Sequence, residues 1–309
     1  MFSIYINKNS FLHNVPDGHP ERVDRYYVIK EMIKENYIKY VKNVPLIDGI
    51  EEIISINHSY DYIKNIKSKI PNEGFHQLDP DTYLSKKSLD AAYMGVSTSI
   101  EALKDVITGN TRRAFVCTRP PGHHSEPNKA MGFCIFSNAA IIAKYAQQNY
   151  NLKKIAVLDF DIHHGNGTQE SFLHFKDLYL FSSHEMPLYP GTGDSIDKGL
   201  GNIFNFPIDP YCSSQKFLNL WKNNILNKVK KLNPDLVILS SGFDAHKDDN
   251  ISTAQLVSQD YKILTKEIVK ISNEICEGKI ISLLEGGYNL KALKESVYEH
   301  LFELNQNFI

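Results

Sequence analysis

The chain contains few cysteines and no long apolar run. Only four of its 309 residues are cysteine, and Cys117, Cys134, Cys212 and Cys276 lie far apart with no CxxC pair. This spacing argues against a disulfide framework and a thiolate zinc site, and it favours buried thiols in a reducing cytosol. The N-terminus lacks a basic region followed by a long apolar run, and no stretch of about 18 apolar residues occurs. We therefore expect a cytoplasmic protein that is neither exported nor bound to a membrane.

An excess of basic charge is also missing. Lysine and arginine total 34 against 36 aspartate and glutamate, a net charge of −2, which argues against direct nucleic-acid binding. The first predicted strand is not followed by a glycine-rich phosphate-binding signature, so a nucleotide-binding protein is disfavoured. No internal repeat, linker or low-complexity tract divides the chain, and its 42% hydrophobic content is enough for one large core. We predict a single domain over residues 1–309.

Apolar strand patterns alternate with helical patterns along the chain. The strand that ends before Asp244 is continuously apolar, which is typical of a parallel sheet covered on both faces. This alternation predicts an α/β fold of three layers, α/β/α, with a single mostly parallel sheet. Helical spacing predicts helices over residues 89–107, 213–232, 261–276 and 290–304, with Trp221 facing the core.

The segment AVLDFDIHHGNGTQ, residues 156–169, places two acids and two histidines directly after an apolar strand. Asp159, Asp161 and His163 would share one small volume, and carboxylates held that close repel one another unless a cation lies between them. We interpret the cluster as a metal site. The alternative is ordinary turn chemistry, with Gly165 and Gly167 supplying left-handed conformations.

Other predicted strands end in the same kind of side chains. The pair His123 and His124, the Asp161 cluster, His184, Asp244 and Tyr288 all follow strand ends. Ligands of open parallel sheets bind outside the carboxyl ends of the strands, so we expect these residues to meet in one crevice.

Asp161, His163 and Asp244 would form a set of three protein ligands with one or two positions free, the pattern of a catalytic zinc site. Two carboxylates cancel the formal charge of the divalent ion, so the ion should be a weaker Lewis acid here than in a site made of three histidines. Catalysis at such an ion would need additional groups.

The histidine pair and a tyrosine are available for that role. His123 or His124 would take a proton from a metal-bound water and return it to a leaving amine, with Asp159 orienting one imidazole and Asn166 the other. Tyr288 would donate its hydroxyl to the oxyanion of a tetrahedral intermediate. Together these groups predict metal-assisted hydrolysis of an amide.

These motifs resemble the zinc-dependent histone deacetylase superfamily, the arginase-deacetylase fold, and in particular its class II and bacterial amidohydrolase members. The match runs over nearly the whole chain in the family order. The motifs are GHPE, RPPGHH, DFDIHHGNG, YPGTG, SSGFDAH and EGGYN.

The resemblance implies a role for each matching position. Zn²⁺ would be bound by Asp161, His163 and Asp244, His124 would be the general base and acid, and His123 its electrostatic partner. The resemblance further implies a substrate tunnel at Gly132, Phe133 and Tyr189, a channel for acetate at Arg25, carbonyl polarisation by Tyr288, and K⁺ near Asp159, Asp161, His163, Ser182 and Ser183.

Two positions bear on class and substrate. Asn166 stands where class I members carry an acid, which is consistent with class II. Ile251 stands where the polyamine-specific branch carries an acidic gatekeeper, and an isoleucine does not attract a distal ammonium. We therefore expect an acetyl-lysine or another small acetylated amine as substrate, with acetylpolyamine hydrolysis as the alternative. Asp79 or Asp81, in LDPDTY, would hold a peptide backbone at the rim of the tunnel, but a role in a turn is favoured for either residue.

A protein that binds such a substrate without turning it over is a third hypothesis, disfavoured because all ligands, both histidines and the tyrosine are present. The sequence leaves the acyl chain length, the choice between zinc and iron, and the oligomeric state open.

Overall fold

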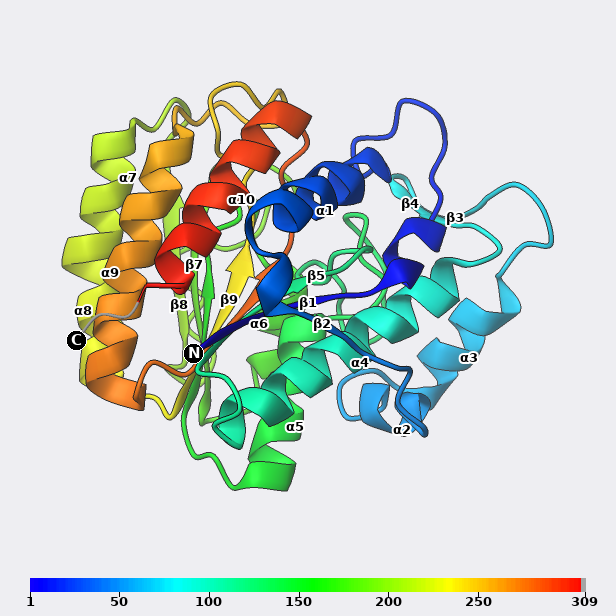
Figure 1. Ribbon diagram of the computed structural model, residues 1–309, viewed down its shortest axis with the longest axis horizontal. Coiled ribbons are helices and arrows are strands. Elements are labelled where there is room, and N and C mark those ends of the chain that lie inside the picture. The colour runs from blue at the N-terminus through cyan, green and yellow to red at the C-terminus, as the bar shows by residue number, and fades with distance from the viewer. Residues whose placement is uncertain (307–309) are drawn as a thin grey trace.

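The computed structural model describes residues 1–306, in which eight strands form one sheet between two layers of helices (Figure 1). All neighbouring strands pair in parallel, in the order β2-β1-β5-β10-β9-β6-β7-β8. The predicted α/β fold with a mostly parallel sheet is confirmed. The strands are β1 (Phe2–Ile6), β2 (Val41–Asn43), β5 (Arg113–Cys117), β6 (Ile155–Asp159), β7 (Leu178–Glu185), β8 (Ile203–Ile208), β9 (Leu236–Ser241) and β10 (Ile280–Leu284).

The central strands are apolar because both faces of the sheet are covered. Every residue of β5, β6, β9 and β10 is buried, and alternate side chains of each strand enter the two hydrophobic cores. The continuous apolar runs in the sequence therefore reflect burial on two sides rather than a single apolar face.

Helices from different parts of the chain form the two outer layers (Figure 1). One core lies beneath α1 (Asp24–Asn36), α7 (Ser214–Leu220), α8 (Leu226–Leu232), α9 (Ser258–Cys276) and α10 (Leu290–Leu304). The other core lies beneath α2 (Ile50–Ile54), α3 (Tyr60–Ser68), α4 (Ser88–Ile107), α5 (Asn138–Tyr150) and α6 (Asn166–Phe172). The predicted helices 89–107, 261–276 and 290–304 agree with α4, α9 and α10 to within three residues.

The predicted helix over residues 213–232 is interrupted. A π-helical turn, Trp221–Ile225, separates α7 from α8. Trp221 is buried in the core, as predicted, and its indole N–H donates to Ser183 Oγ over 3.0 Å. An extra residue in one turn shifts the helical periodicity, so the sequence pattern alone did not predict the break.

Several short elements have no counterpart among the predicted ones. The hairpin of β3 (His76–Asp79) and β4 (Thr82–Leu84) is the one that matters for the site, because its turn contacts the loop after β5. The 3₁₀ turns Lys8–Leu12 and Ile38–Tyr40 flank β1 and α1.

All four cysteines are buried and free, as their spacing predicted. None of the described helices is long and apolar enough to cross a lipid bilayer.

Acid is expected to destabilise the fold through buried neutral histidines, of which His300 is the clearest case. His300 hydrogen-bonds to Thr265 and Ser282, and burial lowers its pKa to about 3. The unfolded chain binds a proton at this residue below about pH 6.5, whereas the folded chain does not, so this stability is present above pH 6.5 and lost as the pH falls toward 3.

Between about pH 7.5 and about pH 5, His300 should remove about 2 kcal/mol from the free energy of unfolding. Urea titrations should show a smaller pH difference in His300→Gln than in the original chain. His174→Gln, at an exposed position, is the control and should keep the full difference. An unchanged difference in His300→Gln would contradict the prediction.

Candidate metal centre

Four neighbouring strands position the candidate site. In the sheet order β5, β10, β9 and β6 are adjacent, and the loops after them carry His123 and His124, Tyr288, Asp244, and Asp161 and His163. Parallel strands end at the same edge of a sheet and lie about 4.8 Å apart, so these four loops start close together. Strand β6 ends at Asp159, so the two candidate ligands that follow it lie on the loop rather than on the strand.

Asp161, His163 and Asp244 each bring one ligand atom to a common point, with all three atoms within 4.8 Å of one another. His163 Nδ1 lies 3.0 Å from Asp161 Oδ1 and 3.1 Å from Asp244 Oδ2. Donors around a tetrahedral zinc ion, with bonds of roughly 2.0–2.1 Å, lie roughly 3.3 Å apart. The structure thus brings the three predicted ligands together at a spacing that suits one ion.

Backbone amides fix both carboxylates. Gly286 N donates to Asp161 Oδ2 over 2.8 Å, and Ile162 N donates to Asp244 Oδ1 over 3.1 Å. A side chain at position 286 would place its Cβ against the carboxylates of both ligands. Position 286 therefore requires glycine, because the two carboxylates approach its backbone too closely for a side chain.

The chemistry of this cluster fits a divalent cation. Asp161 and Asp244 are buried, and within residues 1–306 their salt-bridge partners are histidines rather than lysine or arginine. Burial, and then the charge of Asp161, raises the pKa of Asp244 to about 6. A bound dication would compensate the free-energy cost of burying two carboxylates close together. One imidazole nitrogen with two carboxylates is a donor set that zinc accepts.

His123 and His124 lie side by side with ring centroids 4.0 Å apart, and each has its own partner. His123 Nδ1 lies 3.1 Å from Asp159 Oδ2, and His124 Nδ1 lies 2.8 Å from Asn166 Oδ1. Burial by itself lowers the pKa of both, but the carboxylates of Asp161 and Asp159 raise the pKa of His123 to about 10. Burial and the charge of His123 hold the pKa of His124 well below its ordinary value. The pair thus divides into one charged and one neutral imidazole.

Asn166 also determines which nitrogen of His124 carries the proton. Its amide nitrogen donates to Glu126 Oε1 over 2.8 Å, so its oxygen faces His124. That oxygen is an acceptor, so the proton of His124 lies on Nδ1 and Nε2 is the basic nitrogen.

Glu285 supports the loop that carries the histidines. Its Oε2 accepts hydrogen bonds from Gly122 N over 2.7 Å and from His123 N over 3.1 Å. Burial, partly offset by the charge of His123, raises the pKa of this carboxyl to about 7. Glu285 is the first residue of the motif EGGYN, and the sequence pattern assigned it no role.

Arg25 fixes the turn before Tyr288. It is completely buried and donates from Nε to Gly287 O over 2.6 Å and to the backbone oxygen of Glu285. Its guanidinium lies 4.8 Å from the centroid of the Tyr288 ring, and Glu21 Oε1 forms its ion pair at 2.8 Å. Arg25 therefore lies directly behind the tyrosine.

A cavity of about 200 Å³ lies beside His124, His163 and Tyr288. Two of its lining residues, Phe133 and Tyr288, pack edge to face at 5.7 Å between ring centroids, and the rings of Tyr189 and His124 do so at 5.1 Å. Phe133 has a left-handed backbone (φ 67°), and its N–H is held by Thr82 Oγ1 over 3.0 Å. The cavity is lined by Asp81, His124, Gly132, Phe133, His163, Leu188, Tyr189, Ile251 and Tyr288.

His184 lies outside this cavity, so the expectation that His184 shares the crevice was wrong, although the loop after β7 reaches the cavity through Leu188 and Tyr189. The His184 ring hydrogen-bonds to Ser182 Oγ over 2.9 Å and donates to Gly193 O over 2.9 Å. Strand β7 lies beyond the four central strands, and His184 is used to hold the loop that carries Tyr189. Ser182 and Ser183 are fully buried, and Ser183 accepts from Trp221.

The sequence profile of the histone deacetylase domain matches residues 19–304 of this chain. The chain belongs to the histone deacetylase family.

Relatives of this histone deacetylase family member occur in bacteria, archaea and eukaryotes. It is 33% identical over 307 residues to the Synechocystis sp. protein named "Uncharacterized protein slr0245", covering 97% of this chain and 98% of that one. A "Probable deacetylase" of Archaeoglobus fulgidus is 29% identical over 296 residues, covering 93% and 81%. "Type-2 histone deacetylase 2" of Dictyostelium discoideum is 33% identical over 340 residues, covering 94% of this chain and 20% of that protein.

The fold agrees with a solved histone deacetylase. The crystal structure titled "HDA15 HD domain" superposes with a TM-score of 0.91 at 27% identity, covering 98% of this chain and 87% of that chain. The family and fold implied by the sequence motifs are confirmed. As a histone deacetylase family member, the chain is an enzyme of the deacetylase and amidohydrolase type.

Proposed function

We propose that this histone deacetylase family member hydrolyses the N-acyl amide of an acetyl-lysine side chain or a related acetylated amine and releases acetate. The observation that carries the proposal is a buried group of three candidate metal ligands, Asp161, His163 and Asp244, of which His163 lines the same cavity as His124 and Tyr288. Strands from Phe2 to Leu284 all belong to one sheet apart from the β3–β4 hairpin, which supports the prediction of one domain over residues 1–309.

Zinc held by Asp161, His163 and Asp244 would supply Lewis acidity and lower the pKa of a water molecule. His124 Nε2 is the group that accepts a proton from the attacking water and returns it to the leaving amine. His123, whose Nδ1 lies 3.1 Å from Asp159 Oδ2, stabilises negative charge that develops beside it.

Tyr288 and the cavity walls determine which bond is placed for attack. The Tyr288 hydroxyl donates to the developing oxyanion, and burial keeps it protonated by raising its pKa well above the ordinary value. Phe133 and Tyr189 flank the methylene chain of the substrate, with Gly132 and Ile251 on the remaining walls.

Two further assignments follow from the family resemblance. Arg25, buried behind Tyr288, would stabilise acetate as it leaves. K⁺ would bind near Asp159, Asp161, His163, Ser182 and Ser183, which are all buried.

Hydrolysis of acetylpolyamines is the second candidate. Asp81 lines the cavity, and a carboxylate at the entrance would attract the second ammonium of such a substrate. Burial, and then Asp79, raises the pKa of Asp81 to about 6, so it is mostly ionised at pH 7. Its Oδ1 is already engaged by Gly132 N over 3.2 Å and by Thr82, and Ile251 adds an apolar wall, which favours a mono-acylated amine.

A panel of substrates with zinc-loaded protein tests the proposal. We expect acetate release from an acetyl-lysine peptide with a higher kcat/KM than from acetylputrescine or acetylspermidine. The reason is that Asp81, the carboxylate that lines the cavity, already accepts hydrogen bonds from Gly132 N and Thr82. Asp81→Asn is the matched variant and should reduce turnover of the acetylpolyamines more than that of the peptide.

A preference for the acetylpolyamines in the original chain would instead select the second candidate. No acetate release from any acylated amine would exclude both hydrolase assignments.

A further inference from the structure

We propose that Asp249 is a positioning residue that holds Tyr288 in register with the metal-binding loop. The inference rests on the proposed function, in which Tyr288 donates to the oxyanion. Asp249 lies five residues after the candidate ligand Asp244, on the loop between β9 and α9, and neither the family motifs nor the sequence pattern assigned it a role.

The Asp249 carboxylate reaches across to the other loop. It is only 4% exposed, and its Oδ2 accepts hydrogen bonds from Tyr288 N over 2.6 Å and from Asn289 N over 3.0 Å. Asn289 is the N-cap of α10, so the carboxylate lies at the positive end of a 15-residue helix. A buried carboxylate that accepts two backbone amides fixes the peptide planes on both sides of the Tyr288 Cα.

The same residue is tied back to the metal-binding loop. Asp249 N donates to His246 O over 2.8 Å, and Asp249 Oδ1 lies 3.4 Å from the N–H of Ile251, a cavity wall. Ser252 Oγ then donates to Asp244 O over 2.8 Å. Asp249 therefore connects the metal ligand, one wall of the cavity and the tyrosine.

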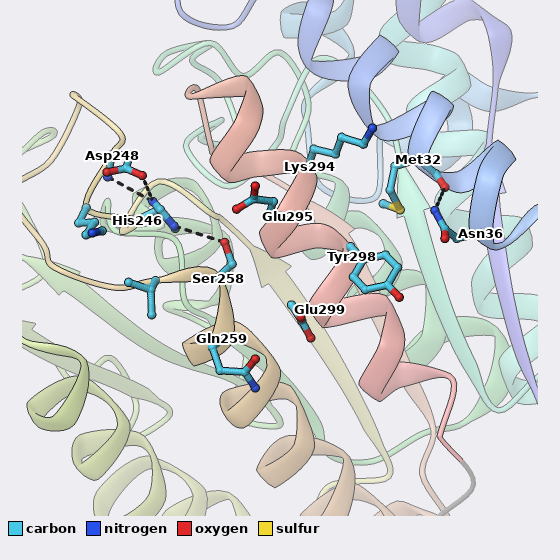
Figure 2. Close-up of a pocket in the computed structure, with 12 residues that line it drawn as sticks. Met32, Asn36, His246, Asp248, Ser258, Gln259, Lys294, Glu295, Tyr298 and Glu299 are labelled. Atoms are coloured by element: carbon cyan, nitrogen blue, oxygen red, sulfur yellow. Dashed lines mark hydrogen bonds and ion pairs between the residues drawn. The ribbon is translucent and has the colours of Figure 1, made fainter.

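A cavity borders one side of this loop. A cavity of about 730 Å³ lies between the loop, α9, α10 and α1, and His246 and Asp248 border it (Figure 2). Figure 2 shows His246 linked to Asp248 and to Ser258 at the start of α9. Lys247 and Asp248 are exposed, whereas His246 is buried and pairs with Leu256, so hydrogen bonds, those of Asp249 among them, contribute to the position of the loop.

A double-mutant cycle tests the coupling in the zinc-loaded chain. Asp249→Asn keeps the shape of the side chain but replaces one acceptor oxygen by a donor, and we expect kcat for an acetyl-lysine peptide to fall about tenfold, and about 100-fold in Asp249→Ala, at nearly constant KM and zinc content. In the Tyr288→Phe background the same substitutions should lower kcat by less than about threefold, because that variant lacks the hydroxyl that Asp249 positions. Asp248→Asn, whose side chain is 60% exposed, is the control and should retain activity.

A fluorinated tyrosine at position 288 gives a readout that requires neither zinc nor turnover. The fluorine resonance should be single and narrow in the otherwise unchanged chain and in Asp248→Asn, and shifted or broadened in Asp249→Asn. If the original chain releases no acetate, the proposed function fails, while the spectra still test the position of Tyr288.

Identical fluorine spectra in the original chain and Asp249→Asn would overturn the inference. So would equal losses of kcat from the Asp249 substitutions with and without the Tyr288 hydroxyl, because Asp249 would then act through something other than Tyr288.

Discussion

Asp244→Asn is expected to reduce acetate release roughly 1,000-fold, with a matching loss of bound zinc. Asp244 supplies one of three ligand atoms that lie within 4.8 Å of one another, and an amide is a poor substitute for a carboxylate in this donor set. Zinc content by atomic emission and initial rates with an acetyl-lysine peptide measure the two effects.

The thermal stability of the same variant separates loss of a ligand from loss of the fold. Without metal, Asp244→Asn removes one of two buried carboxylates that repel each other, so its Tm should equal or exceed that of the metal-free original chain. Added zinc should raise the Tm of the original chain and leave that of the variant nearly unchanged. Asp248→Asn should respond to zinc like the original chain. Full activity and zinc content in Asp244→Asn would exclude Asp244 as a ligand.

Tyr288→Phe is expected to reduce kcat by about 100-fold to about 1,000-fold while KM and zinc content stay nearly constant. Removing one oxyanion donor has an effect of this size because the donor acts mainly in the transition state. The ring itself remains against Phe133 and Arg25, so the cavity keeps its shape. Steady-state kinetics with the acetyl-lysine peptide provide the measurement.

Tyr211→Phe is the control for this substitution. Tyr211 is 72% exposed and does not line the cavity, so the loss of its hydroxyl should leave kcat unchanged. A Tyr288→Phe enzyme with the original kcat would remove the tyrosine from the proposed mechanism, and a rise in KM alone would reassign it to substrate binding.

The layered fold and the chemistry of the metal ligands were readable from the sequence because both depend on short-range order. A strand buried on two faces is rich in apolar residues, as β9 is, and carboxylates as close in the sequence as Asp159 and Asp161 repel one another unless a cation lies between them. Helices such as α9 and α10 were predicted to within three residues, because an apolar stripe repeats along each of them.

Local patterns failed where a distant partner decides the outcome. The π-helical turn begins at Trp221, whose buried side chain donates to Ser183 Oγ. His184 lies outside the cavity and donates to Gly193 O instead. The hydrogen bonds of Glu285 and Asp249 to the loops that carry His123 and Tyr288 have no sequence signal, since single acids at loop positions are common.

By itself, the sequence determined that apolar strands are followed by side chains suited to metal binding and acid–base chemistry. Residue type and spacing along one segment are sufficient to predict such a strand and the side chains after it. Only the tertiary structure decided that β5, β10, β9 and β6 are neighbours, that their loops enclose one cavity, and that Arg25 and Asp249 hold Tyr288 there. These relations join residues far apart in the sequence, 39 positions in the case of Asp249 and Tyr288, and their geometry depends on strand order and packing rather than on any local preference.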